Sequence, residues 1–204
     1  MLARGRSCYV GTMPSPIGHL VAGVTVAWVT QALAPARAPM GAVGSPDPRR
    51  APVPASLVAV CAALALAPDV DILWATHRAY THSLGAVALA AGVAAIVARA
   101  RGDRVAPFAL ACAAAWGSHV LLDWLGHDSS PPVGLMALWP FMDTYIYSGL
   151  DLFGDVSRRY WRPREFIIGN AAAVLRELLI LAPPAALAFW LRRRAYGRRV
   201  TLEP

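Results

Sequence analysis

The sequence predicts an all-α protein: a polytopic transmembrane helical bundle with about four to five membrane helices and an aromatic-rich interfacial segment. Of the 204 residues, 57% are hydrophobic and only 15% are charged, whereas a soluble domain usually carries about 25% charged residues. Long apolar runs recur along the chain, with no alternating strand pattern of useful length. Lipid rather than water is therefore the expected solvent for most of the chain.

Five apolar runs are the expected helices, and they cover residues 17–34, 55–67, 83–98, 106–125 and 166–191. The first run has 18 residues, at the lower edge of the length that spans a bilayer. It ends in Gln31-Ala32-Leu33-Ala34, so a cleaved signal peptide is the alternative interpretation of this run. The fifth run contains Arg176-Glu177 and Pro183-Pro184, which leaves open whether it crosses the membrane.

The segments outside the runs differ in composition. Residues 1–16 are expected to be a disordered N-terminal extension, and the Pro-rich residues 35–54 a flexible linker. Residues 131–165 are dense in Trp, Tyr and Phe, which is typical of a membrane interface. Residues 192–204 form an Arg-rich tail, so the membrane domain is expected to cover residues 17–191.

The charge pattern argues against nucleic-acid binding. The net charge of +7 comes from arginines that lie in the connections and the tail, as membrane topology requires. A nucleic-acid surface would gather them on one soluble face among aromatic residues. The three cysteines form no CxxC motif, so Cys61 and Cys112 are expected to be small core hydrophobes.

Short polar islands stand at the ends of the apolar runs and contain the five histidines. They are residues 16–19 (PIGH), 68–71 (PDVD), 77–83 (HRAYTHS) and 119–123 (HVLLD), with His127 just beyond. Histidine and aspartate are common ligands of divalent metals, and an apolar segment strongly resists burying them. Grouped in this way, they suggest a metal site at a membrane face.

The order of the islands predicts that they converge. His19 starts the first run, Asp69 and Asp71 follow the second, His82 starts the third, and His119 lies near the end of the fourth. If successive helices run in alternating directions, all four islands fall at the same end of the bundle. Within the fourth run, His119 and Asp123 share one helical face, with Cβ atoms about 5–6 Å apart.

Such a site suits one or two divalent ions, with zinc first and manganese or iron as alternatives. The expected ligands are His19, Asp69, Asp71, His82, His119 and Asp123. Each island also has an ordinary interpretation: His82 could belong to a helix cap, His77 could be a loop residue, and His119 could form a metal-free buried pair with Asp123. A shared metal site is preferred because it explains all the islands at once.

Five motifs also carry a resemblance to a known family. They are residues 14–19 (PSPIGH), 67–71 (APDVD), 77–83 (HRAYTHS), 117–123 (GSHVLLD) and 134–141 (GLMALWPF). In kind, order and spacing they resemble the LexA-binding, inner-membrane-associated hydrolase family, also called membrane-bound metal-dependent hydrolases. The resemblance covers roughly residues 13–141, and it makes Met13 the expected start of the protein.

The resemblance implies a multi-pass protein of the bacterial cytoplasmic (inner) membrane with a divalent-metal site, and it carries over to His77 as well as to the six expected ligands. Many relatives have Gly where this chain has Ala79, and a methyl group there could alter a tight turn and shift His77. The family's hydrolase description supplies no substrate.

The leading functional hypothesis is metal-assisted hydrolysis of a phosphoester or lipid at the bilayer surface, with no nucleic-acid partner. The expected catalytic residues are His77 and Asp71, which would move protons, and Arg78, which would bind an anionic group. A membrane transporter and a non-catalytic membrane partner of a regulator are the alternatives, and the sequence specifies no protein partner. If the fifth run crosses the membrane, the positive-inside rule places the site outside the cytoplasm; otherwise the site faces the cytoplasm.

Overall fold

The computed structural model describes residues 14–33, 56–74, 78–129, 131–157 and 160–200. Within these ranges the regular structure is helical, in the order α1 (Pro16–Leu33), α2 (Leu57–Leu66), η2 (Ala67–Trp74), η3 (Tyr80–His82), α3 (Leu84–Arg101), α4 (Val105–Leu125), η4 (Glu165–Gly169) and α5 (Asn170–Val200). The short elements η2 and η3 are 3₁₀ helices, and η4 is a π-helical turn. Extended pairing in these ranges is limited to two isolated β-bridges. The all-α prediction is confirmed.

Four helical stretches are long and apolar enough to cross a membrane: Pro16–Leu33, Leu84–Arg101, Val105–Leu125 and Phe166–Ala195. The last of these contains the run whose crossing the sequence left open, and it stays helical through Pro183 and Pro184. The second expected run is different, because α2 has only 10 residues before the chain tightens into η2. The structure therefore supports a multi-pass membrane protein with four long helices and one short one.

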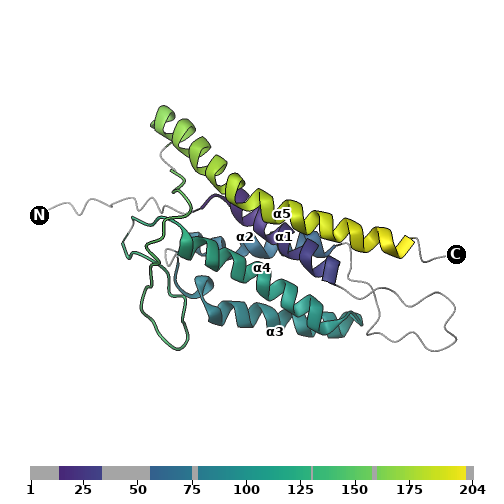
Figure 1. The fold of residues 1–204 in the computed structure, drawn as a ribbon. Coiled ribbons are helices and arrows are strands. Elements are labelled where there is room, and N and C mark those ends of the chain that lie inside the picture. The colour runs from purple at the N-terminus through teal and green to yellow at the C-terminus, as the bar shows by residue number, and fades with distance from the viewer. Residues whose placement is uncertain (1–13, 34–55, 75–77, 130, 158–159, 201–204) are drawn as a thin grey trace, which may run out of the picture.

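Helix α1 lies at the centre of the bundle, in contact with α2, α4 and α5, while α3 packs against α4 (Figure 1). The core between these helices is made mainly of small side chains. Its fully or nearly fully buried members are Ala27, Leu57, Cys61, Ala94, Ala98, Phe108, Ala111, Cys112 and Ala115. Small residues at helix contacts let the backbones approach closely, which is how helices associate in lipid.

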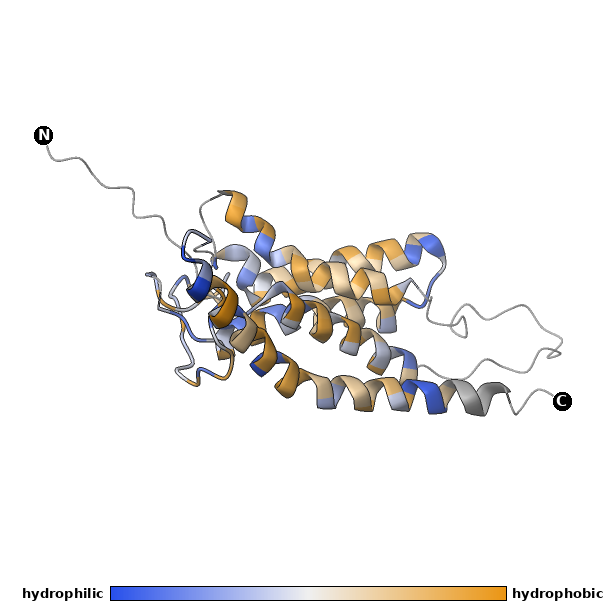
Figure 2. Cartoon of the chain, turned by 90° about the horizontal axis from the view of Figure 1, so that it is seen from above, coloured by the Kyte–Doolittle hydropathy of each residue, from blue (hydrophilic) through white to orange (hydrophobic). Residues whose placement is uncertain are grey.

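Large apolar side chains cover much of the outer surface. On α3, Leu89 and Ile96 are 70% and 71% exposed, and Leu179 on α5 is 68% exposed. Figure 2 shows the hydrophobic colour continuing along these helices, with hydrophilic segments gathered towards the ends of the bundle. An outside of this kind is compatible with contact to acyl chains rather than to water.

The helix directions place the polar islands at one end of the bundle. The start of α1, the end of α2, the start of α3 and the end of α4 lie there together with the loop of residues 126–129 and 131–157 (Figure 1). The exposed side chains of this loop include Phe141 and Leu150, and Tyr160 and Trp161 beyond it are exposed as well. The opposite end carries Arg101, Arg104 and the C-terminal part of α5.

Helices α1 and α2 approach each other closely at Gly23. A Cβ atom at this position would lie 2.5 Å from the carbonyl oxygen of Cys61 and 2.7 Å from the Cβ atom of Ala65. Real Cβ atoms do not tolerate such distances, so α1 and α2 depend on a glycine here for their separation. Gly92 on α3 is the opposite case, since a Cβ atom there would meet nothing within 4 Å.

We expect Gly23→Ala to lower the thermal unfolding midpoint of the detergent-purified protein. Overpacking costs about 1–3 kcal/mol, which outweighs the gain of about 1 kcal/mol from replacing Gly by Ala inside a helix. Gly92→Ala is the matched control and should leave the midpoint unchanged or slightly raised. Equal midpoints for the two variants in thermal scans would contradict this packing.

Candidate metal centre

Four side chains from three of the polar islands meet at the polar end of the bundle. Asp69 comes from η2, His82 from η3, and His119 and Asp123 from α4, and one ligand atom of each lies within 4.8 Å of all the others. His82 and His119 are fully buried, Asp123 is nearly so, and the Asp69 side chain retains 19% of its exposure. We call these four residues the His/Asp cluster.

The distances show that the cluster converges on a single point. The Nε2 atoms of His82 and His119 are 3.0 Å apart. The Oδ2 atom of Asp123 lies 3.1 Å from the first of these nitrogens and 3.2 Å from the second. The Oδ1 atom of Asp69 is farther out, at 3.8 Å and 3.6 Å from the same two atoms.

The outer nitrogens of both imidazoles face oxygen atoms. The Nδ1 atom of His119 lies 2.7 Å from the carbonyl oxygen of Ala65, and Nδ1 of His82 lies 3.2 Å from Oδ2 of Asp71. An acceptor opposite Nδ1 favours a proton on that nitrogen, which leaves the Nε2 lone pair free to bind a metal. Both lone pairs then point into the His/Asp cluster.

The carboxylates add further uncompensated acceptors. Although buried, Oδ1 of Asp69 and both carboxylate oxygens of Asp123 have no hydrogen-bond donor. Buried charged oxygens without donors are costly, and a cation placed among them removes that cost. The donor set of two imidazoles and two carboxylates therefore fits a divalent ion such as zinc, manganese or iron.

A proton can serve the same electrostatic purpose. Burial lowers the pKa of His82, but the nearby carboxylates of Asp123, Asp69 and Asp71 outweigh burial and hold that pKa well above its usual value. Because a histidine must be neutral to bind a metal, protons and metal ions compete for this imidazole.

Asp71 lies on the side of His82 that faces away from the cluster. Besides approaching Nδ1 of His82, its Oδ2 atom accepts hydrogen bonds from the backbone N–H of Arg78 at 3.1 Å and from the Thr81 hydroxyl at 2.5 Å. Such a carboxylate fixes the orientation and tautomer of a metal-binding imidazole. A direct metal contact by Asp71 stays a prediction.

His19 adjoins the cluster through the other oxygen of Asp123. Its Nε2 atom is 3.3 Å from Oδ1 of Asp123, and its ring stacks on His119 with centroids 3.8 Å apart. His19 is fully buried, and neither ring nitrogen has a hydrogen-bond partner. The structure thus places His19 beside the four-residue cluster, and its role as a ligand stays a prediction.

Arg78 and His77 were expected to act in catalysis. Arg78 is buried, forms an ion pair with Asp128, and has a positive φ of 65°. Asp128 also accepts a hydrogen bond from the backbone N–H of Gly134 at 2.6 Å, so the pair ties the histidine-rich segment to the following loop. His77 lies outside the described residues, and the positive φ falls at Arg78 rather than at Ala79.

The segment with the sequence GLMALWPF supports the start of α3. The backbone N–H groups of Leu84 and Gly85 donate to the carbonyl oxygens of Ala137 and Trp139 at 2.8 Å and 2.9 Å. The first N–H groups of a helix lack partners within the helix, so these bonds cap α3 immediately after His82. A Cβ atom at Gly85 would lie 2.6 Å from the Trp139 ring, which explains the glycine.

His127 belongs to a different group at the same end of the molecule. Its Nδ1 atom lies 3.2 Å from Oδ2 of Asp151, and the two side chains are 43% and 45% exposed. The Tyr147 hydroxyl donates to the same carboxylate. The hydrogen bond from Tyr147, followed by the one from His127, lowers the pKa of Asp151. This exposed group is a natural comparison for the buried cluster.

Glu177 was not predicted to have a role, because in the sequence it stands out only as a charge that interrupts the fifth apolar run. Glu177 is fully buried on α5 and accepts hydrogen bonds from the backbone N–H of Ser15, at 2.6 Å, and from the Ser15 hydroxyl. The Ser15 hydroxyl oxygen in turn accepts from the N–H of Gly18 at 3.2 Å, at the first turn of α1. The carboxylate therefore fixes the turn that carries His19. Acidic residues are rare inside membrane helices, and this feature of the sequence could have identified Glu177 as a residue with a role.

Comparison with known proteins identifies the family. The family model described as YdjM inner membrane protein matches residues 13–195. A search of curated proteins and a search of solved structures each found no match. Because the family match covers most of the chain and the structure has four helices long and apolar enough to span a membrane, this chain belongs to the YdjM family of inner membrane proteins and is a multi-pass member of it.

Proposed function

We propose that this chain is a membrane-bound metal-dependent hydrolase that acts on a phosphoester or lipid at the bilayer surface. Asp69, His82, His119 and Asp123 would hold the ion. The observation that carries the proposal is the convergence of two imidazole Nε2 atoms, 3.0 Å apart, with carboxylate oxygens that lack hydrogen-bond donors. Such a donor set is compensated by a divalent cation.

A bound divalent ion would supply an acidified water and would polarise a phosphoryl or carbonyl group of the substrate. The protein side chains would do the remaining work. Asp69 is the most exposed member of the cluster and lies farthest from the two Nε2 atoms, so it marks the side from which water and substrate would enter. Its carboxylate is also the nearest candidate to accept a proton there.

The remaining expected catalytic residues would act around this opening. Asp71 would orient His82 and fix its tautomer, as its contact with Nδ1 suggests. Arg78, already paired with Asp128, would hold the loop around the site and could share its guanidinium with an anionic substrate. His77 remains a proposed proton carrier.

Transport is the less favoured function. The substrate and ion sites of secondary transporters lie near the bilayer midplane, whereas the cluster lies where α4 ends and where α3 begins. Metal uptake into proteoliposomes that contain the purified protein would reverse this preference.

A non-catalytic metal brace is a second candidate, and the burial of the site favours it. Structural zinc sites usually have four protein ligands, whereas catalytic sites keep one position for water. The cluster offers four residues, of which three are buried. Hydrolysis assays on two proteins separate the two functions. Loss of hydrolysis in Asp69→Asn with the metal retained supports the hydrolase. Absence of hydrolysis in the metal-loaded wild type supports the brace.

We propose that the site faces the non-cytoplasmic side of the membrane. The stretch Phe166–Ala195 is long enough to cross, which would place the Arg-rich C-terminal end of α5 on the side favoured by the positive-inside rule, the cytoplasm. A reporter that is active only in the cytoplasm should then be active when it is fused after Pro204. Activity of a periplasmic reporter at this position would reverse the orientation.

We expect His119→Ala to lose most of the bound metal and with it any hydrolysis of model phosphoesters, because it removes one of the two converging imidazoles. Metal is measured by elemental analysis of protein purified in detergent. His127→Ala is the matched control, since His127 is exposed and pairs with Asp151 outside the cluster. Full metal content in His119→Ala would rule out this assignment.

We expect Asp71→Asn to weaken metal binding about 10- to 100-fold without abolishing it, as for other residues that orient a ligand. The affinity is measured by competition with a chromogenic chelator. Asp155→Asn, at an exposed loop position, controls for the lost charge. A complete loss equal to that of His119→Ala would instead make Asp71 a direct ligand, and unchanged affinity would remove it from the site.

A further inference from the structure

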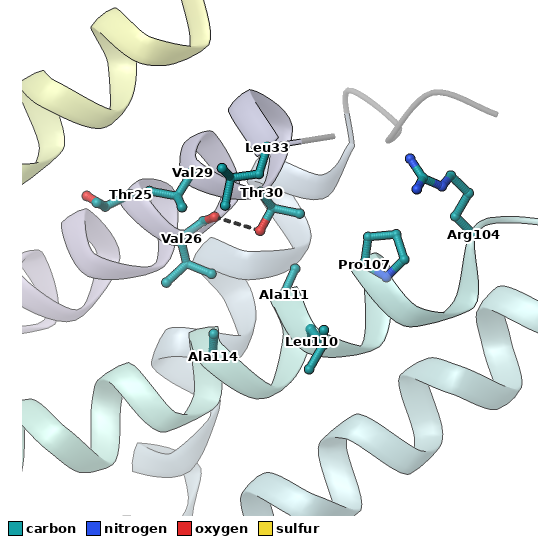
Figure 3. Close-up of a pocket in the computed structure, with 10 residues that line it drawn as sticks. All are labelled: Thr25, Val26, Val29, Thr30, Leu33, Arg104, Pro107, Leu110, Ala111 and Ala114. Carbon is teal, nitrogen blue, oxygen red and sulfur yellow. Dashed lines mark hydrogen bonds between the residues drawn. The ribbon is translucent and has the colours of Figure 1, made fainter. Parts of the chain in front are cut away.

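A groove of about 430 Å³ lies between α1 and α4, away from the His/Asp cluster (Figure 3). It is bordered by residues of the second half of α1, from Thr25 to Leu33, and of the first half of α4, up to Ala114. Its volume falls within the range of about 300–1,000 Å³ that is usual for small-molecule sites. Because α1 begins and α4 ends at the cluster, the groove belongs to the opposite half of the membrane.

The walls of the groove are suited to hydrocarbon. Val26, Val29 and Leu110 present apolar side chains, and the two threonines that border it use their hydroxyls internally. Thr25 donates to the carbonyl oxygen of Val21 at 2.7 Å, and Thr30 donates to that of Val26 at 2.9 Å (Figure 3). With these donors engaged, the walls select against a polar solute and accept an acyl chain.

One end of the groove carries a cation. Arg104 lies next to Pro107 at the start of α4 (Figure 3), and its guanidinium has no ion pair among the described residues. The neighbouring Arg101 differs, because its Nε atom lies 3.3 Å from a carboxylate oxygen of Asp103. A guanidinium binds phosphate well, and basic pockets between transmembrane helices are typical sites for anionic headgroups.

We propose that this groove binds one anionic phospholipid, with an acyl chain along α1 and α4 and the phosphate at Arg104. The charge at one end and the apolar walls together match this single amphipathic ligand. The site is separate from the His/Asp cluster and lies in the other leaflet, so this lipid is not the substrate of the proposed hydrolase. The proposal is therefore independent of that function.

The test is native mass spectrometry of the full chain in detergent, incubated with an equimolar mixture of phosphatidylglycerol and phosphatidylcholine of the same chain length. The wild type should retain one phosphatidylglycerol in preference to phosphatidylcholine. Arg104→Gln should reduce that preference about fivefold, which corresponds to one arginine near a lipid headgroup. Arg101→Gln is the matched control, because it removes the same charge from the same turn but leaves the groove intact.

A second variant tests the walls. Ala114→Phe fills the groove and should lower the retention of both lipids, while its unfolding midpoint reports whether the fold persists. Equal effects of Arg101→Gln and Arg104→Gln, or unchanged retention in folded Ala114→Phe, would overturn the proposal. A wild type without headgroup preference would also overturn the proposal, and this is the result expected if residues 34–55 occupy the groove. A change of oligomeric state in Ala114→Phe would overturn it too, and this is the result expected if a second copy of the chain occupies the groove.

Discussion

The organisation of the polar end of this protein depends on a group of buried acceptor atoms that the fold must hold together. Two imidazole Nε2 atoms lie beside the carboxylates of Asp69 and Asp123, whose buried oxygen atoms have no hydrogen-bond donor. In a low-dielectric setting this arrangement is unfavourable by itself, and side chains free to move would separate. They stay together because they are attached to three helical elements, η2, η3 and α4, whose packing is decided elsewhere in the bundle.

The supporting contacts come from several parts of the chain. The Ala65 carbonyl orients His119, Asp71 orients His82, and the loop around Trp139 caps the helix that follows His82. Glu177 secures the turn before His19 from a helix near the other end of the sequence. Rigid support of this kind would let a metal site keep its geometry.

Local sequence features predicted much of this arrangement. The i, i+4 spacing of His119 and Asp123 and the alternation of helix ends required only chain geometry, and both led to the right end of the bundle. The inward direction of Asp69 and the outward direction of Asp71 could not be read from a DxD pattern, because they depend on the 3₁₀ helix η2, which follows α2 and was not predicted. The contact of Glu177 with Ser15 joins residues 162 positions apart, and no local pattern contains that information.

The abrupt end of α2 has a consequence for how this site tolerates change. Pro68 has no N–H to continue the helix, and the chain tightens into η2 at Ala67. The Ala65 carbonyl, which a longer helix would have used internally, is thereby released to His119. The imidazole is oriented by the main chain, so the identity of the side chain at position 65 matters only for packing. A helix that ended one turn later would use the Ala65 carbonyl internally and would leave Nδ1 of His119 without this acceptor.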